Sequence, residues 1–402
     1  MFGRAVLNSI RSSSFAHSGT VMGAKLQDYF QIPNRSGNST LFPQGAHAIK
    51  ISNIAKLGGG LSNDVYSFYL SYEVGTSKRT QVAILKTYLK TIDPFEVIRK
   101  HYAYSGEGLS RCNREFQMLR NLKFVGFPVP EVYDCETNVR FLGLPFIITQ
   151  KEEVVKKSIE EVVDSFAQTL ANLHNLQLSR INVNFLRTPE DEYAFARSWP
   201  IHFKKYLNNE PKHEKKLKKE FNLAIRWLHS NVTKNECPQY CLIHGDYHPG
   251  NVCVNQDSEL IVLDWDSIEI GDPALDVGYA YHFIKFFSNP WNPNLAEPVA
   301  DRFVSEYAKH FKGDVGRRLN YYKLVGILGA SIFYSSGLSN PIYAYRNHHR
   351  KIIPSLPFFG SFIVLLGFPF IKHPLIARQL ATEGDLLWLK YFENSLGTLT
   401  NS

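Results

Sequence analysis

The strongest signal in this chain of 402 residues is the segment HGDYHPGN, which runs from His244 to Asn251. A second polar segment, DWD, follows at residues 264–266. Short apolar runs rich in Val, Leu and Ile flank both segments, and glycines at 245 and 250 permit sharp changes of backbone direction. This order predicts strands that hold two polar turns in a rigid β-hairpin.

Three side chains in these two segments suit the transfer of a phosphoryl group. The reaction depends on positioning and on neutralising charge, and a carboxylate must accept or orient the acceptor hydroxyl. Asp246 can fill that role. Asn251 and Asp264 offer the hard oxygen atoms that Mg²⁺ prefers. The two segments therefore predict a kinase-like phosphotransferase that uses Mg²⁺.

The same segments resemble the signature of the aminoglycoside phosphotransferase and choline kinase superfamily, which reads HGDxHxxN and later D-[WF]-[DE]. GDPALD at 271–276 also resembles the family's GDPxxDL, although Val277 replaces the usual Leu. The resemblance implies that Asp246 is the catalytic base. It also implies that Asn251 and Asp264 bind the metal, Asp264 being the counterpart of the DFG aspartate of protein kinases.

The resemblance gives four neighbouring residues supporting roles. We expect His244 and Asp276 to hold the catalytic loop through hydrogen bonds. His248 occupies a motif position and is expected to shape the loop or to lie near the acceptor. For Asp266 two readings stay open, an acid close to the metal and a solvated turn residue.

A second set of residues is expected to bind the nucleotide. A glycine-rich turn lets backbone N–H groups approach phosphates. The segment VAILK resembles the lysine-bearing strand of protein kinases, and REFQML resembles the family helix whose Glu pairs with that Lys. A hinge between two lobes would meet adenine through its backbone. The resemblance thus assigns ATP binding to Gly58, Gly59, Gly60, Ser62, Lys86, Glu115, Thr149 and Lys151.

The sequence pattern also predicts the domain organisation. Residues 1–45 are rich in Ser, Gly and Asn and are predicted to be disordered, with a short helix near 26–30 as an alternative. Short β-like runs and one helical pattern predict a nucleotide-binding N-lobe over 46–150. Mostly helical patterns predict a catalytic and acceptor-binding C-lobe over 151–402. The expected architecture is α+β and bilobal, a protein-kinase-like fold with a small β-rich N-lobe and a larger helical C-lobe that carries the catalytic β-hairpin.

The net charge of +8 does not by itself indicate a nucleic-acid partner. Much of the excess comes from a Lys-rich run between 204 and 219, whose interspersed Glu residues are typical of a solvated helix face. No nucleic-acid-binding motif accompanies this run. The expected partners are therefore ATP and a small-molecule hydroxyl acceptor.

Two segments bear on location. The uncharged stretch 352–371 is about as long as a membrane span, but prolines and glycines interrupt it. We expect a buried helix or hairpin there, with membrane contact as the alternative. Residues 1–27 lack Asp and Glu, which is compatible with a mitochondrial transit peptide, although a disordered or mis-assigned start is the favoured reading. The predicted location is the cytoplasm, with a mitochondrial or membrane-associated location as the alternative.

Two other functions stay open on the sequence. A protein kinase would carry HRD and DFG where this chain has HGD and DWD, and it would carry an A-P-E segment that this chain lacks. A nucleotide-binding regulator without catalysis is disfavoured because Lys86, Asp246 and both predicted metal ligands are intact. Family members act on aminoglycosides, choline, amino acids and sugars, and no acceptor-binding residues can be carried over to this chain.

Overall fold

The computed structural model describes residues 19–32, 42, 45–59, 63–88, 111–209, 215–289 and 293–339. These residues form two compact units with a boundary between Glu153 and Val154. The first unit contains the described residues up to Tyr88 and those from Arg111 to Glu153, and the second begins at Val154. The predicted boundary at residue 150 lies close to this one.

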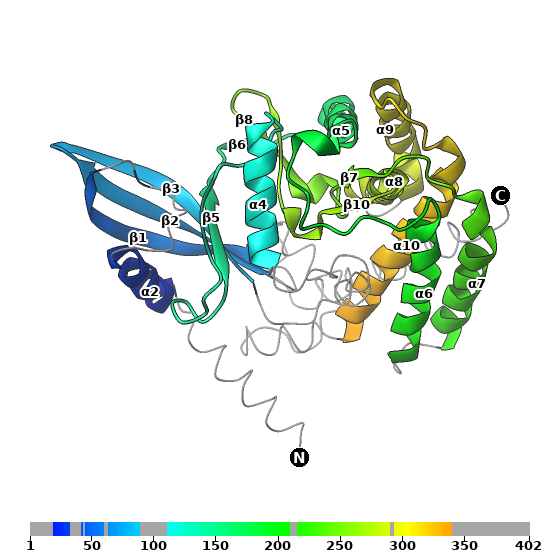
Figure 1. The fold of residues 1–402 in the computed structure, drawn as a ribbon, viewed down its shortest axis with the longest axis horizontal. Helices are drawn as coiled ribbons and strands as arrows, with labels where there is room; N and C mark the ends of the chain where they lie inside the picture. Colours follow the sequence, from blue (N-terminus) through cyan, green and yellow to red (C-terminus); the bar gives the residue numbers. More distant parts are fainter. Residues whose placement is uncertain are drawn as a thin grey trace, which may run out of the picture. The chain divides into compact units, whose positions relative to one another are not determined.

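The first unit is built on an antiparallel sheet of five strands in the order β1-β2-β3-β5-β4 (Figure 1). Side chains alternate between the two faces of each strand. On β3, Ala83 and Leu85 therefore point into the hydrophobic core, whereas Lys86 and Tyr88 point to the other face. The strands are β1 Ala46–Gly59, β2 Asn63–Val74, β3 Ser77–Tyr88, β4 Val132–Glu136 and β5 Phe146–Gln150.

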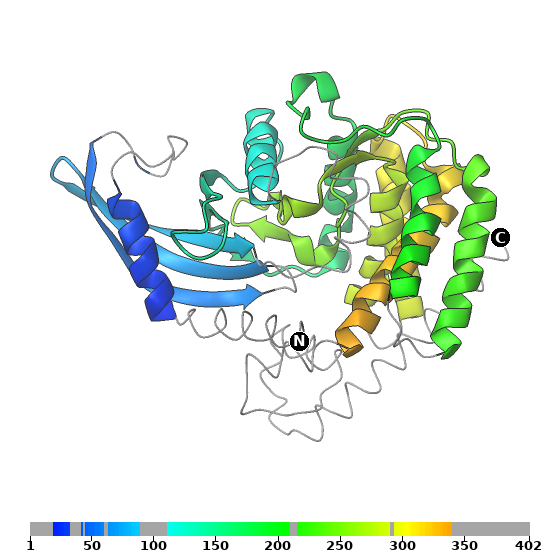
Figure 2. The same cartoon turned by 60° about the horizontal axis from the view of Figure 1, so that its bottom comes forward.

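A helix, α2, spans Gly19–Gln31 and covers one face of this sheet (Figure 2). The alternative of a short helix near 26–30 within the predicted disordered segment 1–45 is therefore confirmed, and the helix is longer than predicted. Met22, Leu26, Tyr29 and Phe30 recur at helical spacing, and all four are buried in the core with side chains of β2, β3 and β5. Fully burying such a side chain contributes roughly 1.5–3 kcal/mol, enough to order a helix that its polar flanks obscure.

Polar contacts also anchor α2. The side-chain amide of Gln27 donates to the backbone oxygen of Ile49 at 2.9 Å and accepts from the backbone N–H of Ile51 at 2.7 Å. Both partners lie on β1, the edge strand of the sheet. Gln27 thus pairs backbone groups that an edge strand would otherwise leave open.

The helix α4, Arg111–Phe124, lies against β4 and β5 in the same unit. Its buried side chains include Cys112, Phe116, Met118 and Leu122, which follow a helical spacing. Glu115 is buried on this helix although it is acidic, and a buried carboxylate needs a partner. The one helical pattern predicted within the N-lobe is confirmed as this helix.

The second unit is mostly helical, as predicted, and it encloses two small antiparallel sheets. One sheet pairs β7 with β10, and the other has the order β6-β8-β9. The strands are β6 Val154–Val155, β7 Cys241–Ile243, β8 Val252–Asn255, β9 Leu260–Val262 and β10 Glu269–Gly271. The helices are α5 Ile159–His174, α6 Ala194–Asn209, α7 Lys215–Asn231, α8 Ala274–Ser288, α9 Glu297–His310 and α10 Gly316–Ser339. These elements confirm the α+β fold class.

The helix α8 forms the centre of the second unit and packs against both α9 and α10. Every residue from Ala274 to Phe286 is buried. Glycines let the backbones of α8 and α10 approach closely, because a Cβ at Gly278 would lie 2.6 Å from the backbone carbonyl carbon of Tyr322. A helix whose residues are mostly apolar is expected to sit inside a core, and α8 does, with its few polar side chains also buried.

The stretch 352–371, the predicted buried or membrane-contacting segment, lies outside the described residues. Within the described ranges, no helix combines the length and the apolar character that crossing a membrane requires.

Candidate active site

The predicted catalytic loop begins where β7 ends, at a glycine whose conformation and surroundings both matter. Gly245 has a φ of 76°, in the left-handed region that favours glycine. A Cβ at this position would lie 2.4 Å from the backbone oxygen of Ser267. The loop can therefore pass next to the turn before β10 only if residue 245 has no side chain. Asp246 follows with 27% of its side chain exposed.

His244 links the two polar turns through both of its ring nitrogens. Its Nδ1 accepts a hydrogen bond from the backbone N–H of Asp246 at 3.2 Å, so Nε2 carries the proton. Nε2 donates to the backbone oxygen of Leu263, the residue before Asp264, at 2.9 Å. The ring is fully buried. His244 thus supports both turns, as the sequence predicts.

Asp276, in the first turn of α8, accepts hydrogen bonds from two backbone N–H groups of the loop. Its Oδ2 accepts from the backbone N–H of His244 at 2.7 Å, and its Oδ1 accepts from that of Gly245 at 2.8 Å. The carboxylate is completely buried. Hydrogen bonds to a charged acceptor are strong in such surroundings, so this contact fixes the path of the backbone into Asp246.

His174, the last residue of α5, is the third partner of Asp276. Its Nε2 lies 3.1 Å from Oδ2 of Asp276, and its Nδ1 lies 2.8 Å from the hydroxyl of Tyr307. Burial raises the pKa of Tyr307 well above its usual value, so the hydroxyl keeps its proton and donates to Nδ1. The resulting chain runs from α9 through α5 to the catalytic loop.

Asn251 and Asp246 face each other across the loop. The Nδ2 of Asn251 donates to the backbone oxygen of Asp246 at 3.0 Å and to its Oδ2 at 3.1 Å. With the amide nitrogen turned to Asp246, Oδ1 of Asn251 points away and can bind a cation. The backbone oxygen of Asn251 accepts from the N–H of Leu263 at 2.8 Å, which ties the base of the hairpin together.

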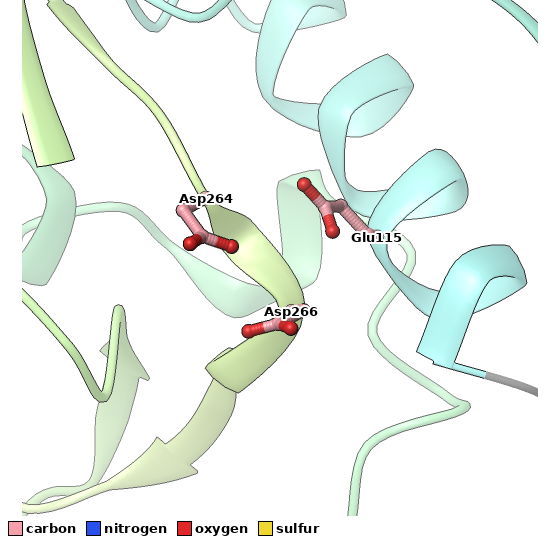
Figure 3. Close-up of side chains that lie close together, drawn as sticks. All are labelled: Glu115, Asp264 and Asp266. Atoms are coloured by element: carbon pink, nitrogen blue, oxygen red, sulfur yellow. The ribbon is translucent and has the colours of Figure 1, made fainter. Parts of the chain in front are cut away.

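Asp264 and Asp266 lie on the loop that leaves β9, and Glu115 lies on α4 (Figure 3). Asp264 has φ 60° and ψ 64°, a left-handed conformation that is uncommon outside glycine and recurs at functional sites. Carboxylate oxygens of Asp264 and Asp266 lie within 4.8 Å of one another. Asp266 also accepts a hydrogen bond from the Ser267 hydroxyl at 3.2 Å. The donor set of Asn251 and Asp264 consists of hard oxygens and fits Mg²⁺.

His248 lies between Asp246 and three aromatic rings of α8. Its ring stacks on Phe283 with a centroid separation of 4.8 Å, and Phe287 and Tyr279 lie farther along the same helix, α8. Nδ1 accepts from the backbone N–H of Gly250 at 3.0 Å, which leaves the protonated Nε2 at 3.8 Å from Oδ2 of Asp246. Burial lowers the pKa of His248 to about 3, so the ring is neutral. The sequence alone did not predict that these aromatic residues lie next to His248.

A groove of about 580 Å³ opens beside the catalytic loop in the second unit. Its lining comes from β6, the first turn of α5, β8 and β9, together with Pro249 and Phe287. Phe287, one of the lining residues, has its ring 6.0 Å from that of His248. Lys156 and Lys157 line the groove among apolar side chains.

In the first unit, the structure pairs Lys86 with Glu115 as the sequence predicts. Nζ of Lys86 lies 2.7 Å from Oε2 of Glu115, and both side chains are buried. Gly58 and Gly59 end β1 and pair with Val65 and Asp64 on β2. Gly60 and Ser62 lie outside the described residues.

The predicted hinge residues differ in their surroundings. Thr149 pairs with Ile84 on one side and with Val132 on the other, so it lies inside the sheet. Lys151 is exposed and follows the last paired residue, Gln150. Backbone contact to a nucleotide is therefore more accessible from Lys151 onward than from Thr149, because the strand pairing already engages the backbone around Thr149.

Comparison with known proteins agrees with this geometry. A family model described as "Phosphotransferase enzyme family" matches residues 54–311, which is more than half of the chain. Acyl-CoA dehydrogenase family member 11 of Gallus gallus is 25% identical over 259 residues, covering 58% of this chain and 32% of the relative. Acyl-CoA dehydrogenase family member 10 of Mus musculus is 24% identical over 180 residues, covering 42% and 16%.

The chain thus spans about a third or less of the length of these two curated relatives. Among solved structures, the choline kinase of Streptococcus pneumoniae is similar at 14% identity, covering 83% of this chain and 93% of that one, with a TM-score of 0.45.

Proposed function

The chain belongs to the phosphotransferase enzyme family, and on this premise we propose that it transfers the γ-phosphate of ATP to a hydroxyl group of a small molecule. The observation that carries the proposal is the pairing of Asn251 with Asp246. One amide holds the carboxylate in place through its nitrogen and keeps its oxygen for a cation. A base and a metal ligand are thereby set next to each other, as phosphoryl transfer requires.

In this proposal Asp246 accepts the proton of the acceptor hydroxyl. The hydroxyl oxygen attacks the γ-phosphorus while the bond from that phosphorus to the β–γ bridging oxygen breaks, and ADP leaves with the electron pair of that bond. The protonated Nε2 of His248, 3.8 Å from Oδ2 of Asp246, limits where the carboxylate can turn. His244 and Asp276 keep the backbone of Asp246 fixed and do not touch the reacting groups. Mg²⁺ held by Asn251 and Asp264 would neutralise charge on the phosphates.

Lys86 is proposed to bind the nucleotide phosphates, with Glu115 as its partner. The pair is buried, so the charge of Lys86 is less screened than that of a surface lysine. Gly58 and Gly59 would let the adjoining backbone approach the phosphates, and the chain from Lys151 onward would meet adenine. ATP is proposed as the phosphate donor, because the family resemblance assigns these residues to ATP binding.

The groove beside the catalytic loop supports a small-molecule acceptor. Its volume of about 580 Å³ matches the size of pockets that bind small molecules. Phe287 lines the groove and its ring lies 6.0 Å from that of His248, so we propose that an acceptor bound there can present a hydroxyl toward Asp246. The acyl-CoA dehydrogenase activity in the names of the two relatives is not proposed for this chain.

The test is transfer of ³²P from γ-labelled ATP to small-molecule fractions of a cell extract, followed by identification of the labelled product. We expect labelling with the wild-type chain and a loss of about 10²–10⁴-fold with Asp246→Asn, which removes the base but keeps the shape. Asp257→Asn, on the exposed tip of the hairpin, is the matched control.

Binding of ATP should survive Asp246→Asn, as calorimetry can measure. Transfer that persists unchanged in this variant contradicts the proposed base. ATP binding without transfer to any fraction would favour a nucleotide-binding regulator instead.

A further inference from the structure

The Lys86–Glu115 pair has a third member. The hydroxyl of Tyr88 donates to Oε2 of Glu115 at 2.6 Å, the same oxygen that receives Nζ of Lys86 at 2.7 Å. All three side chains are buried, with at most 8% of any residue exposed. Tyr88 follows Lys86 by two residues on β3, so the strand turns both to the same face of the sheet.

Tyr88 is itself held from two sides. Nζ of Lys86 lies 5.3 Å from the centre of its ring, and the guanidinium carbon of Arg111 lies 5.6 Å from it. Both distances are within the range of cation–π attraction. Arg111 is the first residue of α4 and lies one helical turn from Glu115. The ring therefore packs between two cations while its hydroxyl reaches the carboxylate.

Arg111 continues the network to the next strand. Its Nη2 donates to Oδ1 of Asn63 at 3.3 Å, and Asn63 is the buried first residue of β2. Asn63 comes directly after the glycine-rich segment that the sequence assigns to phosphate binding. Hydrogen bonds and ring contacts thus join the end of that segment to Lys86 through Arg111, Tyr88 and Glu115 in turn.

We infer that Tyr88 is a positioning residue for nucleotide binding, and that it acts by fixing the Glu115 carboxylate against Lys86. A carboxylate oxygen with a single donor can rotate about its terminal bond, whereas two donors on the same oxygen define its orientation. The Tyr88 hydroxyl also takes up part of the negative charge of Oε2, so that Lys86 is oriented by Glu115 without being fully neutralised by it. This inference rests on the proposed function, because it takes Lys86 as a phosphate ligand.

A purely structural role for Tyr88 makes different predictions. A tyrosine that only fills space would affect the unfolding temperature, and its hydroxyl would matter little for Lys86. Tyr88→Phe separates the two roles because it keeps the ring between Lys86 and Arg111 and removes only the hydroxyl. Tyr69→Phe is the matched control, since Tyr69 lies on β2 of the same sheet with 43% of its surface exposed.

The experiment compares the wild-type chain, Tyr88→Phe and Tyr69→Phe by calorimetric titration with Mg·ATP. We expect the dissociation constant of Tyr88→Phe to rise roughly tenfold, since the lost hydrogen bond is to a charged group. Tyr69→Phe should stay within about twofold of the wild type. In a Glu115→Gln background, Tyr88→Phe should cause little further change, because residues that act through one another are not additive.

A second readout does not depend on nucleotide binding. Lys86 is labelled with a succinimidyl ester in the absence of nucleotide, and the modified peptide is quantified by mass spectrometry. Tyr88→Phe should increase labelling of Lys86 severalfold, because Glu115 no longer holds the amine in one orientation. Arg111→Lys, which keeps the charge but loses the planar stacking, should shift labelling in the same direction by a smaller factor.

These outcomes separate the inference from the proposed function. A wild-type chain that binds no ATP overturns the proposed function, while the labelling of Lys86 still decides whether Tyr88 positions it. Unchanged ATP affinity together with unchanged Lys86 labelling in folded Tyr88→Phe overturns the inference. If Tyr88→Phe does not fold, unchanged labelling in Arg111→Lys overturns it instead.

Discussion

His174 and Asp276 are 102 residues apart in the chain, and their side chains meet with Nε2 3.1 Å from Oδ2 in a fully buried contact. The histidine belongs to α5 and the aspartate to the first turn of α8. Because the same carboxylate holds the backbone of His244 and Gly245, the contact connects two core helices to the catalytic loop. The loop geometry therefore depends on the packing of the whole second unit.

Replacing Asp276 by asparagine should destabilise the chain and abolish its activity. Three groups donate to the Asp276 carboxylate: the backbone N–H groups of His244 and Gly245, and Nε2 of His174. The NH₂ group of an asparagine cannot accept a hydrogen bond, so at least one of these buried donors loses its partner. We expect a loss of roughly 2–4 kcal/mol in the free energy of unfolding, measured by urea denaturation. Asp257→Asn at the hairpin tip should change it by less than about 0.5 kcal/mol. A stable, active Asp276→Asn chain would contradict the role given to this carboxylate.

Magnesium dependence should distinguish the two acids of the DWD segment. Asp264→Asn removes a proposed ligand, and we expect the Mg²⁺ concentration for half-maximal ATP binding to rise on the order of tenfold or more. Asp266→Asn should cause a smaller rise, since Asp266 already accepts a bond from the Ser267 hydroxyl. Titration of Mg²⁺ at fixed ATP gives both values, and an equal shift in the two variants would make Asp266 a ligand as well.

Stability should fall in mild acid because of His282. Burial lowers the pKa of this residue from 6.5 to about 3, so the fold prefers the neutral ring while the unfolded chain takes up a proton near pH 6.5. The contribution of the neutral His282 ring to the free energy of unfolding is complete above pH 6.5, and it is lost progressively as the pH falls toward 3.

Lowering the pH from 7 to 5 should reduce the free energy of unfolding by about 2 kcal/mol through this histidine. His282→Gln keeps a donor for the backbone oxygen of Lys323, which Nε2 of His282 contacts at 2.9 Å, and it cannot titrate. The variant should therefore show a flatter dependence of stability on pH in urea denaturation. An unchanged slope would mean that His282 is charged in the fold.

A side chain at Gly278 should separate α8 from α10. The Cβ of Gly278→Ala would lie 2.6 Å from the backbone of Tyr322, and backbone atoms inside a packed core cannot move aside cheaply. We expect a loss of about 1–3 kcal/mol, read from the thermal unfolding midpoint. Gly316→Ala is the control, because its Cβ meets only the Asp314 side chain at 3.2 Å. Equal stability of the two variants would contradict the close approach.

The catalytic loop was predictable because its chemistry is local. His244, Asp246 and Asn251 lie within eight residues, and short flanking strands leave the loop few possible paths. Lys86 and Glu115 were predicted from resemblance, and the structure pairs them.

The partners of that loop could not be read from the sequence. His174 and Tyr307 contact each other over a separation of 133 residues, which only tertiary packing brings about. For His174 the sequence signal is its place at the end of the segment 166–174, which resembles the LA-x-LH helix of the family and predicts only a packing role. The helix α2 carried a clearer signal, since Met22, Leu26 and Tyr29 fall on one helical face, but its polar neighbours favoured disorder.

The hairpin formed by β8 and β9 is tied at its base and exposed at its tip, where hydrogen bonds between Asn255 and Glu259 close the turn. The bond between the N–H of Leu263 and the oxygen of Asn251 closes the base, while residues 256–259 at the tip are exposed. Extra residues spliced in at the tip should therefore leave both polar turns undisturbed. The tip is consequently a suitable place for a genetically encoded label, which would report on events at the loops without altering them.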